Sequence, residues 1–181
     1  MSTHAGQILK GARLVLRPPR PADRDDRLNA GRDPEFRRMV GGVGPDPGPL
    51  TPPEADRWYS GLHSEPYLWV VEFGGECIGM AKLHHVDPRA RTARYAIGLF
   101  RSEHRGRGFG QEATRLVLDH AFGPLGLERV ELRVLDFNQQ AIACYRRCGF
   151  VEVACELVQL GDSPAHDVVM EARPASSPPA G

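Results

Sequence analysis

The distribution of proline divides this 181-residue chain into two parts that differ in what they can form. Ten of the sixteen prolines lie between positions 18 and 66, and only two fall between positions 89 and 173. Proline lacks a backbone donor and interrupts both helices and central strands. We therefore expect short elements and loops in the first third of the chain, and most of the long helices and strands in the second half.

Length and composition indicate one globular domain. A chain of this length has room for one ordinary core. Its 41% hydrophobic and 25% charged residues exclude a wholly disordered or fibrous chain. We assign residues 1–173 to the domain and expect 174–181, PASSPPAG, to be a disordered tail.

Charge and cysteine content narrow the function classes. The 23 basic and 23 acidic residues give a net charge of zero, which argues against a nucleic-acid binder or an anionic-membrane binder. The first residues lack a signal-peptide pattern, and no stretch approaches the roughly 20 apolar residues of a membrane span, so we expect a cytoplasmic protein. Cys144 and Cys148 are spaced for one helix face, but no second ligand pair matches them, so we expect packing and no metal.

Hydrophobic periodicity predicts a mixed α/β sheet with helices on its faces. We expect strands at 14–16, 67–73, 77–83, 93–100, 130–134, 150–158 and 168–170. We expect helices at 21–30 and 53–61, from 109 to about 121, and at 138–148. The stretch 41–53, GGVGPDPGPLTPP, is expected to be a long loop.

The segment Arg105–Gln111, RGRGFGQ, is the most informative motif, because it lies between a predicted strand and a long helix. Glycines allow close approach of an anion, and the first N–H groups of a helix are unpaired donors at its positive end. This favours a phosphate or pyrophosphate site, although a flexible turn with solvated arginines would have the same residue pattern. The spacing excludes both the P-loop and the Gly-x-Gly-x-x-Gly dinucleotide motif.

RGRGFG resembles the Arg/Gln-x-x-Gly-x-Gly/Ala signature of the GNAT superfamily of acyl-CoA-dependent N-acyltransferases. The run from Leu125 to Glu152 is similar to the next strand and helix of that family, with Asn138, Tyr145 and Gly149 at the same offsets. The opening RLVLRPPRPADRDD resembles the branch of the ribosomal-protein N-terminal acetyltransferases. The similarity extends roughly over residues 12–170.

The resemblance implies a single-domain, mostly antiparallel sheet flanked by about four helices, with a splayed strand pair that forms the acyl-CoA cleft. Acetyl-CoA would be the cosubstrate, with its pantetheine arm along one strand end, its pyrophosphate at the glycine loop, and a further contact from the cap of the last helix. The residues so implied are Ile97, Gly98, Leu99, Arg105, Gly106, Arg107, Gly108, Phe109, Gly110 and Asn138.

Tyr145 resembles the family's proton donor to the departing thiolate, and its seven-residue offset from Asn138 fits that role. Asn138 is equally well explained as a helix cap. Backbone N–H groups near Leu99 could stabilise the oxyanion. The general base stays open among a water chain and four side chains on or near predicted strands: Glu72, His84, His85 and Glu131.

The leading hypothesis is an N-acetyltransferase whose acceptor is a protein N-terminus. Alternatives are a small-molecule amine acceptor, such as a polyamine, aminoglycoside or amino-acid-like amine, and a sensor domain that binds acyl-CoA without turnover. We expect acetyl-CoA and the amine as partners, neither nucleic acid nor a membrane, and a monomer or homodimer. Loops should determine acceptor specificity, namely residues 32–61, the loop after Leu83 and residues 161–166.

Overall fold

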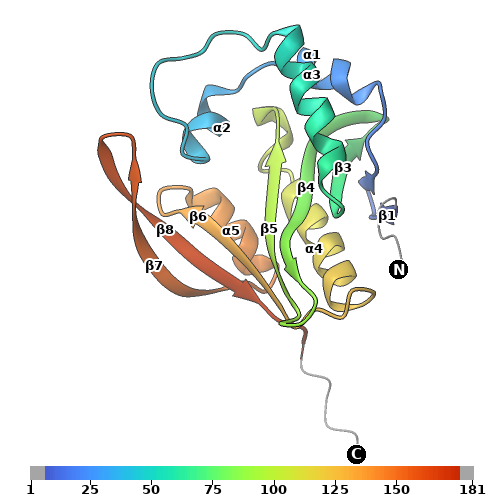
Figure 1. Ribbon diagram of the computed structural model, residues 1–181, viewed down its shortest axis with the longest axis vertical. Helices are drawn as coiled ribbons and strands as arrows, with labels where there is room; N and C mark the ends of the chain where they lie inside the picture. The colour runs from blue at the N-terminus through green and yellow to red at the C-terminus, as the bar shows by residue number, and fades with distance from the viewer. Residues whose placement is uncertain (1–6, 176–181) are drawn as a thin grey trace, which may run out of the picture.

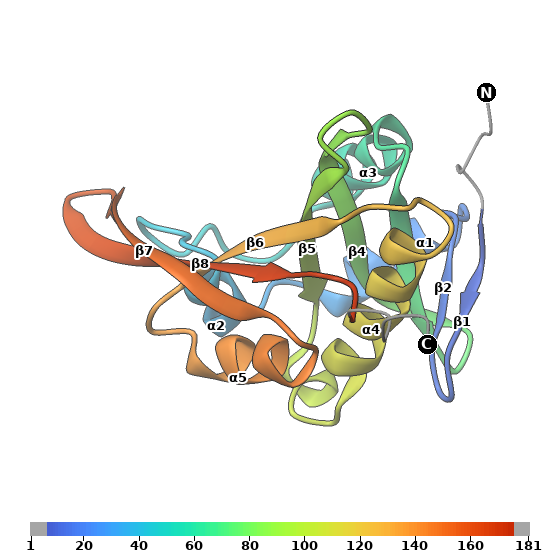
Figure 2. The ribbon, with the colours of Figure 1, turned by 90° about the horizontal axis from the view of Figure 1, so that it is seen from below.

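The computed structural model describes residues 7–175, which form one eight-stranded sheet with helices on both sides (Figures 1 and 2). The strands are β1 (Leu9–Lys10), β2 (Val15–Arg17), β3 (Leu68–Phe73), β4 (Glu76–Asp87), β5 (Thr92–Leu99), β6 (Arg129–Leu135), β7 (Val151–Leu160) and β8 (Ser163–Ala172). The α-helices are α1 (Asp23–Ala30), α2 (Pro34–Met39), α3 (Pro52–Gly61), α4 (Phe109–Phe122) and α5 (Gln139–Arg147). Two short 3-10 turns span Leu62–Ser64 and Ser102–His104. None of the helices in this part of the chain is long and apolar enough to cross a membrane.

The strand order is β1-β2-β3-β4-β5-β6-β8-β7, and every neighbouring pair is antiparallel except β5 and β6. Helices α4 and α5 cover one face, and α3 lies on the other, as Figure 2 shows. The main core forms under α4 and α5, and a smaller one lies beneath α3. This mixed, mostly antiparallel α/β fold confirms the predicted class, with five α-helices where about four were expected.

Strands β5 and β6 pair over only three residues and then separate. Their parallel register runs from Thr92–Arg129 to Arg94–Glu131. Beyond it, β5 stays paired with β4 as far as Leu99, while β6 turns to β8. Figure 1 shows the two strands diverging toward the end of the sheet where α2 lies. The expected splayed strand pair is therefore present, and one edge of residues 95–99 faces the gap.

A buried ion-pair network ties together the first strands and α1. The Arg17 guanidinium donates to both carboxylate oxygens of Asp23, at 2.9 and 2.7 Å, and also to Glu72. Only 2% of Arg17 and none of Asp23 is exposed. Burial acts to lower the pKa of Arg17, but the hydrogen bonds to Asp23 and Glu72 outweigh it and hold that pKa above its ordinary value. The network joins β2, the start of α1 and β3 inside the fold.

Several element boundaries differ from the sequence-based expectations. Strand β1 and helix α2 were not predicted, because β1 has two residues and α2 has only six, of which the first is a proline that follows Gly-Arg-Asp. Strand β8 begins at Ser163 rather than Val168, and its first residues extend a hairpin with β7 where a loop was expected. The first residues of β8, Ser-Pro-Ala-His, are largely exposed and show no alternation of apolar and polar residues. The last six residues of the predicted tail, 176–181, lie outside the described part of the chain.

The buried network gives a stability prediction. Asp23→Asn should lower the free energy of unfolding by about 3 kcal/mol, because it leaves the buried Arg17 charge undercompensated. Urea unfolding followed by circular dichroism measures this loss. The matched control is Asp56→Asn, which removes a carboxylate that pairs with Arg24 at the surface and should leave the midpoint nearly unchanged. Equal losses in the two variants would contradict the role assigned to the network.

Candidate functional site

A cavity of about 670 Å³ opens where β5 and β6 separate. Its walls come from β5, the loop before α4, the end of β6, helices α2 and α5, and β8. Nine of the eleven residues singled out from sequence line it: Ile97, Gly98, Leu99, Arg105, Gly106, Gly108, Gly110, Asn138 and Tyr145. The structure thus brings together residues from three separate stretches of the chain.

The glycine loop ends directly on the N-terminus of α4. Gly106 and Gly108 have φ values of +71° and +83°, which favour glycine because a side chain would strain the backbone. Gly108 is the N-cap of α4, and no side chain caps the helix there. The first N–H groups of α4 therefore lie beside the cavity at the positive end of a fourteen-residue helix, an arrangement suited to an anion.

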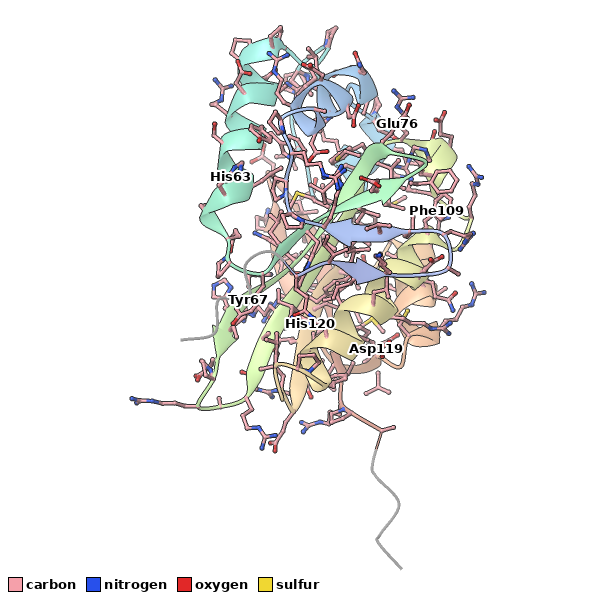
Figure 3. All side chains as sticks on the ribbon, turned by 90° about the vertical axis from the view of Figure 1, so that its right-hand side faces the viewer. His63, Tyr67, Glu76, Phe109, Asp119 and His120 are labelled. Carbon is pink, nitrogen blue, oxygen red and sulfur yellow. The ribbon has the colours of Figure 1, made fainter. Side chains whose placement is uncertain are left out.

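Arg107 and Phe109 are the two predicted residues that do not line the cavity. Phe109 is 1% exposed and packs against Phe73, with ring centroids 4.6 Å apart. Figure 3 shows Phe109 at the opposite end of α4 from Asp119 and His120. The Arg107 guanidinium lies over the Phe109 ring, 5.0 Å from its centroid. Phe109 therefore anchors the loop in the core, and any contact it makes with a ligand would come from its backbone.

Arg105 lines the cavity, but its guanidinium is already paired. Its Nη2 donates to Asp33 at 2.5 Å and lies 3.4 Å from a Glu35 oxygen. The carboxylate of Asp33 also caps α2 by accepting from the N–H groups of Glu35 and Phe36. Burial acts to raise the pKa of Asp33, but the Arg105 hydrogen bond and the Phe36 N–H outweigh it and lower that pKa. Arg105 thus holds α2 against the loop before α4, and its charge is not free to bind a ligand.

Gly98 provides space for α2. A Cβ atom at this position would lie 2.9 Å from the Phe36 ring, too close for a real side chain. The family resemblance places Gly98 beside the pantetheine arm, and in the structure the Phe36 ring lies in the space that a side chain at this position would need. Helix α2 is the main wall that the sequence analysis missed, because its six residues are too few for a periodic signal.

Helix α5 presents Tyr145 to the cavity. Asn138 caps the helix by accepting from the Ala141 N–H at 3.2 Å, and its amide donates to the Met39 carbonyl at 3.3 Å. Tyr145 is half-buried between the rings of Tyr95 and Phe150. Within residues 7–175, no group hydrogen-bonds to its hydroxyl.

The surroundings of Tyr145 keep its hydroxyl protonated. Burial, and then the nearby Cys144 and Cys148 thiols, raise the pKa of Tyr145. A protonated phenol with no protein partner is a hydrogen-bond donor available to whatever occupies the cavity.

None of the four side chains considered as the general base lines the cavity. Glu72 belongs to the Arg17 network, and Glu131 pairs with Arg94 at 3.3 Å. The two histidines contact each other, with their Nδ1 atoms 2.6 Å apart. The carboxylates that do line the cavity are Glu35 and Asp167. Both lie in segments, α2 and the outer half of β8, that sequence reasoning took for loops.

The cysteine pair packs beside the same helix start. Cys144 and Cys148 share a hydrogen bond, and the Cys148 thiol approaches the Gln111 carbonyl at 3.6 Å. The Cys144 sulfur lies against Gly110, 3.7 Å from where a Cβ atom would be. Among residues 7–175 there is no group of three or more side chains suited to hold a metal ion.

Comparison with known proteins gives a consistent result. The family model described as acetyltransferase (GNAT) domain matches residues 13–151. The spermidine N(1)-acetyltransferase of Vibrio cholerae is 35% identical over 75 residues, which are 41% of this chain and 43% of that protein. The match therefore spans less than half the length of this curated relative.

Solved structures share the whole fold. The spermidine N-acetyltransferase of Vibrio cholerae in complex with CoA and spermine superposes with a TM-score of 0.72 at 23% identity, covering 90% of this chain and 96% of that one. Mycobacterium smegmatis RimJ in complex with CoA-disulfide gives a TM-score of 0.78 at 20% identity, covering 96% of this chain and 90% of that one. At these identities the likeness concerns the fold.

The anchoring of α2 can be tested by hydrogen exchange. Asp33→Ala removes both the cap of α2 and the partner of Arg105, so the α2 amides should exchange several-fold faster, as expected for a lost cap worth about 1 kcal/mol. Asp33→Asn can still cap the helix but loses the charge pair, so its effect should be smaller. Glu35→Gln, at an exposed carboxylate 3.4 Å from Arg105, is the control. Unchanged exchange in Asp33→Ala would show that other contacts hold α2.

Proposed function

The chain belongs to the GNAT family of acetyltransferases, and on that premise we propose that it transfers an acetyl group from acetyl-CoA to the amine of a small molecule. The observation that carries the proposal is the opening between β5 and β6, which has an unpaired strand edge along one wall and an uncapped helix N-terminus at one end. These two features suit an extended amide-containing chain that ends in a pyrophosphate.

The chain's own backbone would make most of the contacts to acetyl-CoA. The edge of residues 95–99 offers N–H and C=O groups to the amides of the pantetheine arm, in the manner of an added strand. The N–H groups of residues 106–110 would bind the pyrophosphate. Arg105 contributes through its backbone, because Asp33 already neutralises its side chain. Asn138 lies beside this path as the cap of α5.

Acetyl transfer requires three proton or charge movements, and the cavity offers groups for two of them. Backbone N–H groups near Leu99 would stabilise the oxyanion that forms when the amine attacks the thioester carbonyl. The Tyr145 hydroxyl would then donate its proton to the departing CoA thiolate. Because none of the four expected bases lines the cavity, we assign removal of the amine proton to water.

The acceptor is better supported as a small amine than as a protein N-terminus. A curated relative that aligns with part of this chain is a spermidine N(1)-acetyltransferase. The likeness to RimJ, at 20% identity, supports the fold and no particular acceptor. The unbonded Tyr145 hydroxyl also favours an enzyme over a sensor that binds acyl-CoA without turnover. The deciding experiment measures CoA release with a panel of polyamines and other small amines and with a panel of peptides. Faster release with peptides would restore the protein N-terminus as acceptor.

Substitution of Gly108 tests the cofactor site. Gly108→Val places a branched side chain at the helix N-terminus, so coenzyme A binding measured by calorimetry should be lost at millimolar ligand. Gly74→Val is the matched control, because Gly74 also has a positive φ, +62°, but lies in the β3–β4 turn with open space around it. Normal coenzyme A binding by a folded Gly108→Val protein would exclude this loop as the pyrophosphate site.

Substitution of Tyr145 tests the chemistry separately from binding. Tyr145→Phe keeps the ring and its packing, so acetyl-CoA affinity should stay near wild type. General acid catalysis contributes about 10²- to 10⁴-fold, and the single-turnover rate should fall by that order. Tyr59→Phe, away from the cavity, should react as wild type does. A full single-turnover rate in Tyr145→Phe would mean that the proton comes from water.

A further inference from the structure

The charges that line the cavity differ between its two ends. On one side lie the positive end of α4 and Arg147, which makes no ion pair with any residue among 7–175. On the other side, the carboxylate of Asp167 comes from β8. The other charged residues that line the cavity each lie near an opposite charge: Glu35 and Arg105 near each other, and Arg133 near Glu156. The first side suits the anionic cosubstrate. The second offers negative charge to a cation.

The register of the sheet fixes the direction of Asp167. It stands opposite Leu135 of β6 and Glu156 of β7, and directly paired residues project on the same face. The next residue, Val168, projects on the other face, into the core beneath α4 and α5. Asp167 therefore lies on the face of β8 opposite that core, at the rim of the gap between β5 and β6.

Asp167 is the carboxylate on this face that lacks a partner. Arg133 pairs with Glu156 at 2.5 Å and lies 3.7 Å from Glu131, which also pairs with Arg94. Among the described residues, no group donates a hydrogen bond to the carboxylate of Asp167 and none forms an ion pair with it. Glu171, which lies on the same face, pairs with Arg129 at 3.0 Å. Asp167 is therefore left without a guanidinium partner.

The charge of Asp167 is partly removed from water. Asp167 is half-buried, and the Arg133 guanidinium, which feels its charge, is already engaged by Glu156. A half-buried carboxylate without a partner is less stable than one that meets a cation. Glu35 is 60% exposed and shares Arg105 with Asp33, so it offers much weaker attraction.

We propose that Asp167 is a specificity-determining residue that binds a second ammonium group of the acceptor while the first is acetylated; this rests on the proposed function. The reacting amine must reach the gap beside β5, whereas Asp167 lies on β8, beyond β6. An acceptor with two amines separated by a short alkyl chain can occupy both positions. A monoamine leaves Asp167 unpaired and gains nothing from it.

If Asp167 binds the second ammonium group, removing its charge should weaken acceptor binding and leave the chemical step unchanged. The test compares 1,4-diaminobutane and spermidine with butylamine, which has one amine on the same carbon chain as the diamine. Asp167→Asn keeps the side-chain shape and removes the charge, so KM for the two polyamines should rise about tenfold to a hundredfold. Their kcat should change less than twofold, and KM for butylamine should stay the same. Asp162→Asn, at the exposed tip of the same hairpin, makes the same charge change away from the cavity and should alter neither constant.

Calorimetry on the complex with coenzyme A separates this inference from the proposed function. If the wild type binds 1,4-diaminobutane and Asp167→Asn does not, the inference stands even when turnover is absent. If the wild type acetylates polyamines and the KM ratio of diamine to monoamine is the same in Asp167→Asn, the inference is overturned and the function stands. A fall in kcat with KM unchanged would also overturn it, as would a wild type that neither binds nor acetylates polyamines.

Discussion

The separation of β5 from β6 after the Arg94–Glu131 pair leaves backbone N–H and C=O groups of β5 without a strand partner on one side. Buried backbone groups require hydrogen bonds, so such an edge must face water or a ligand. The site follows from this constraint. The wall of the cavity that β5 forms is a backbone edge. Such an edge can bind the amides of a cosubstrate whatever side chains surround it.

The opening is held from both sides by contacts that lie outside the main core. On the β5 side, Phe36 packs over Gly98, and Arg105 fastens α2 through Asp33. On the β6–β8 side, the loop after α2 reaches the hairpin tip, where Val43 lies 3.6 Å from the Cβ position of Gly161. The Arg17 network and the core under α4 position the glycine loop. The shape of the opening depends on α2 and the β7–β8 hairpin. Substitutions in these two elements should therefore alter the choice of acceptor more than they alter folding.

Sequence reasoning recovered the features that local chemistry specifies. The glycine loop, the helix after it and the Asn138 cap all contain residue types that favour only a few backbone conformations. Helix α2 and the first half of β8 were missed because their form is set by tertiary contacts. The ion pair with Arg105 holds α2, and pairing with the exposed end of β7 holds the first half of β8. Consequently the carboxylates of the cavity were missed too. None of the four residues considered as general bases lines the cavity. Alternation along a strand does not show which strands separate, so it could not locate the cavity.

Hydrogen exchange measured with and without saturating coenzyme A tests whether the β5 edge and the N-terminus of α4 form the binding site. We expect added protection to be concentrated in residues 95–99 and 106–111, because those amides acquire the pantetheine and the pyrophosphate as partners. The β3–β4 turn at Gly74 and Gly75 should show none. Protection that misses both segments while coenzyme A is bound would contradict the account, since the strand edge and the helix N-terminus would then not form the binding site.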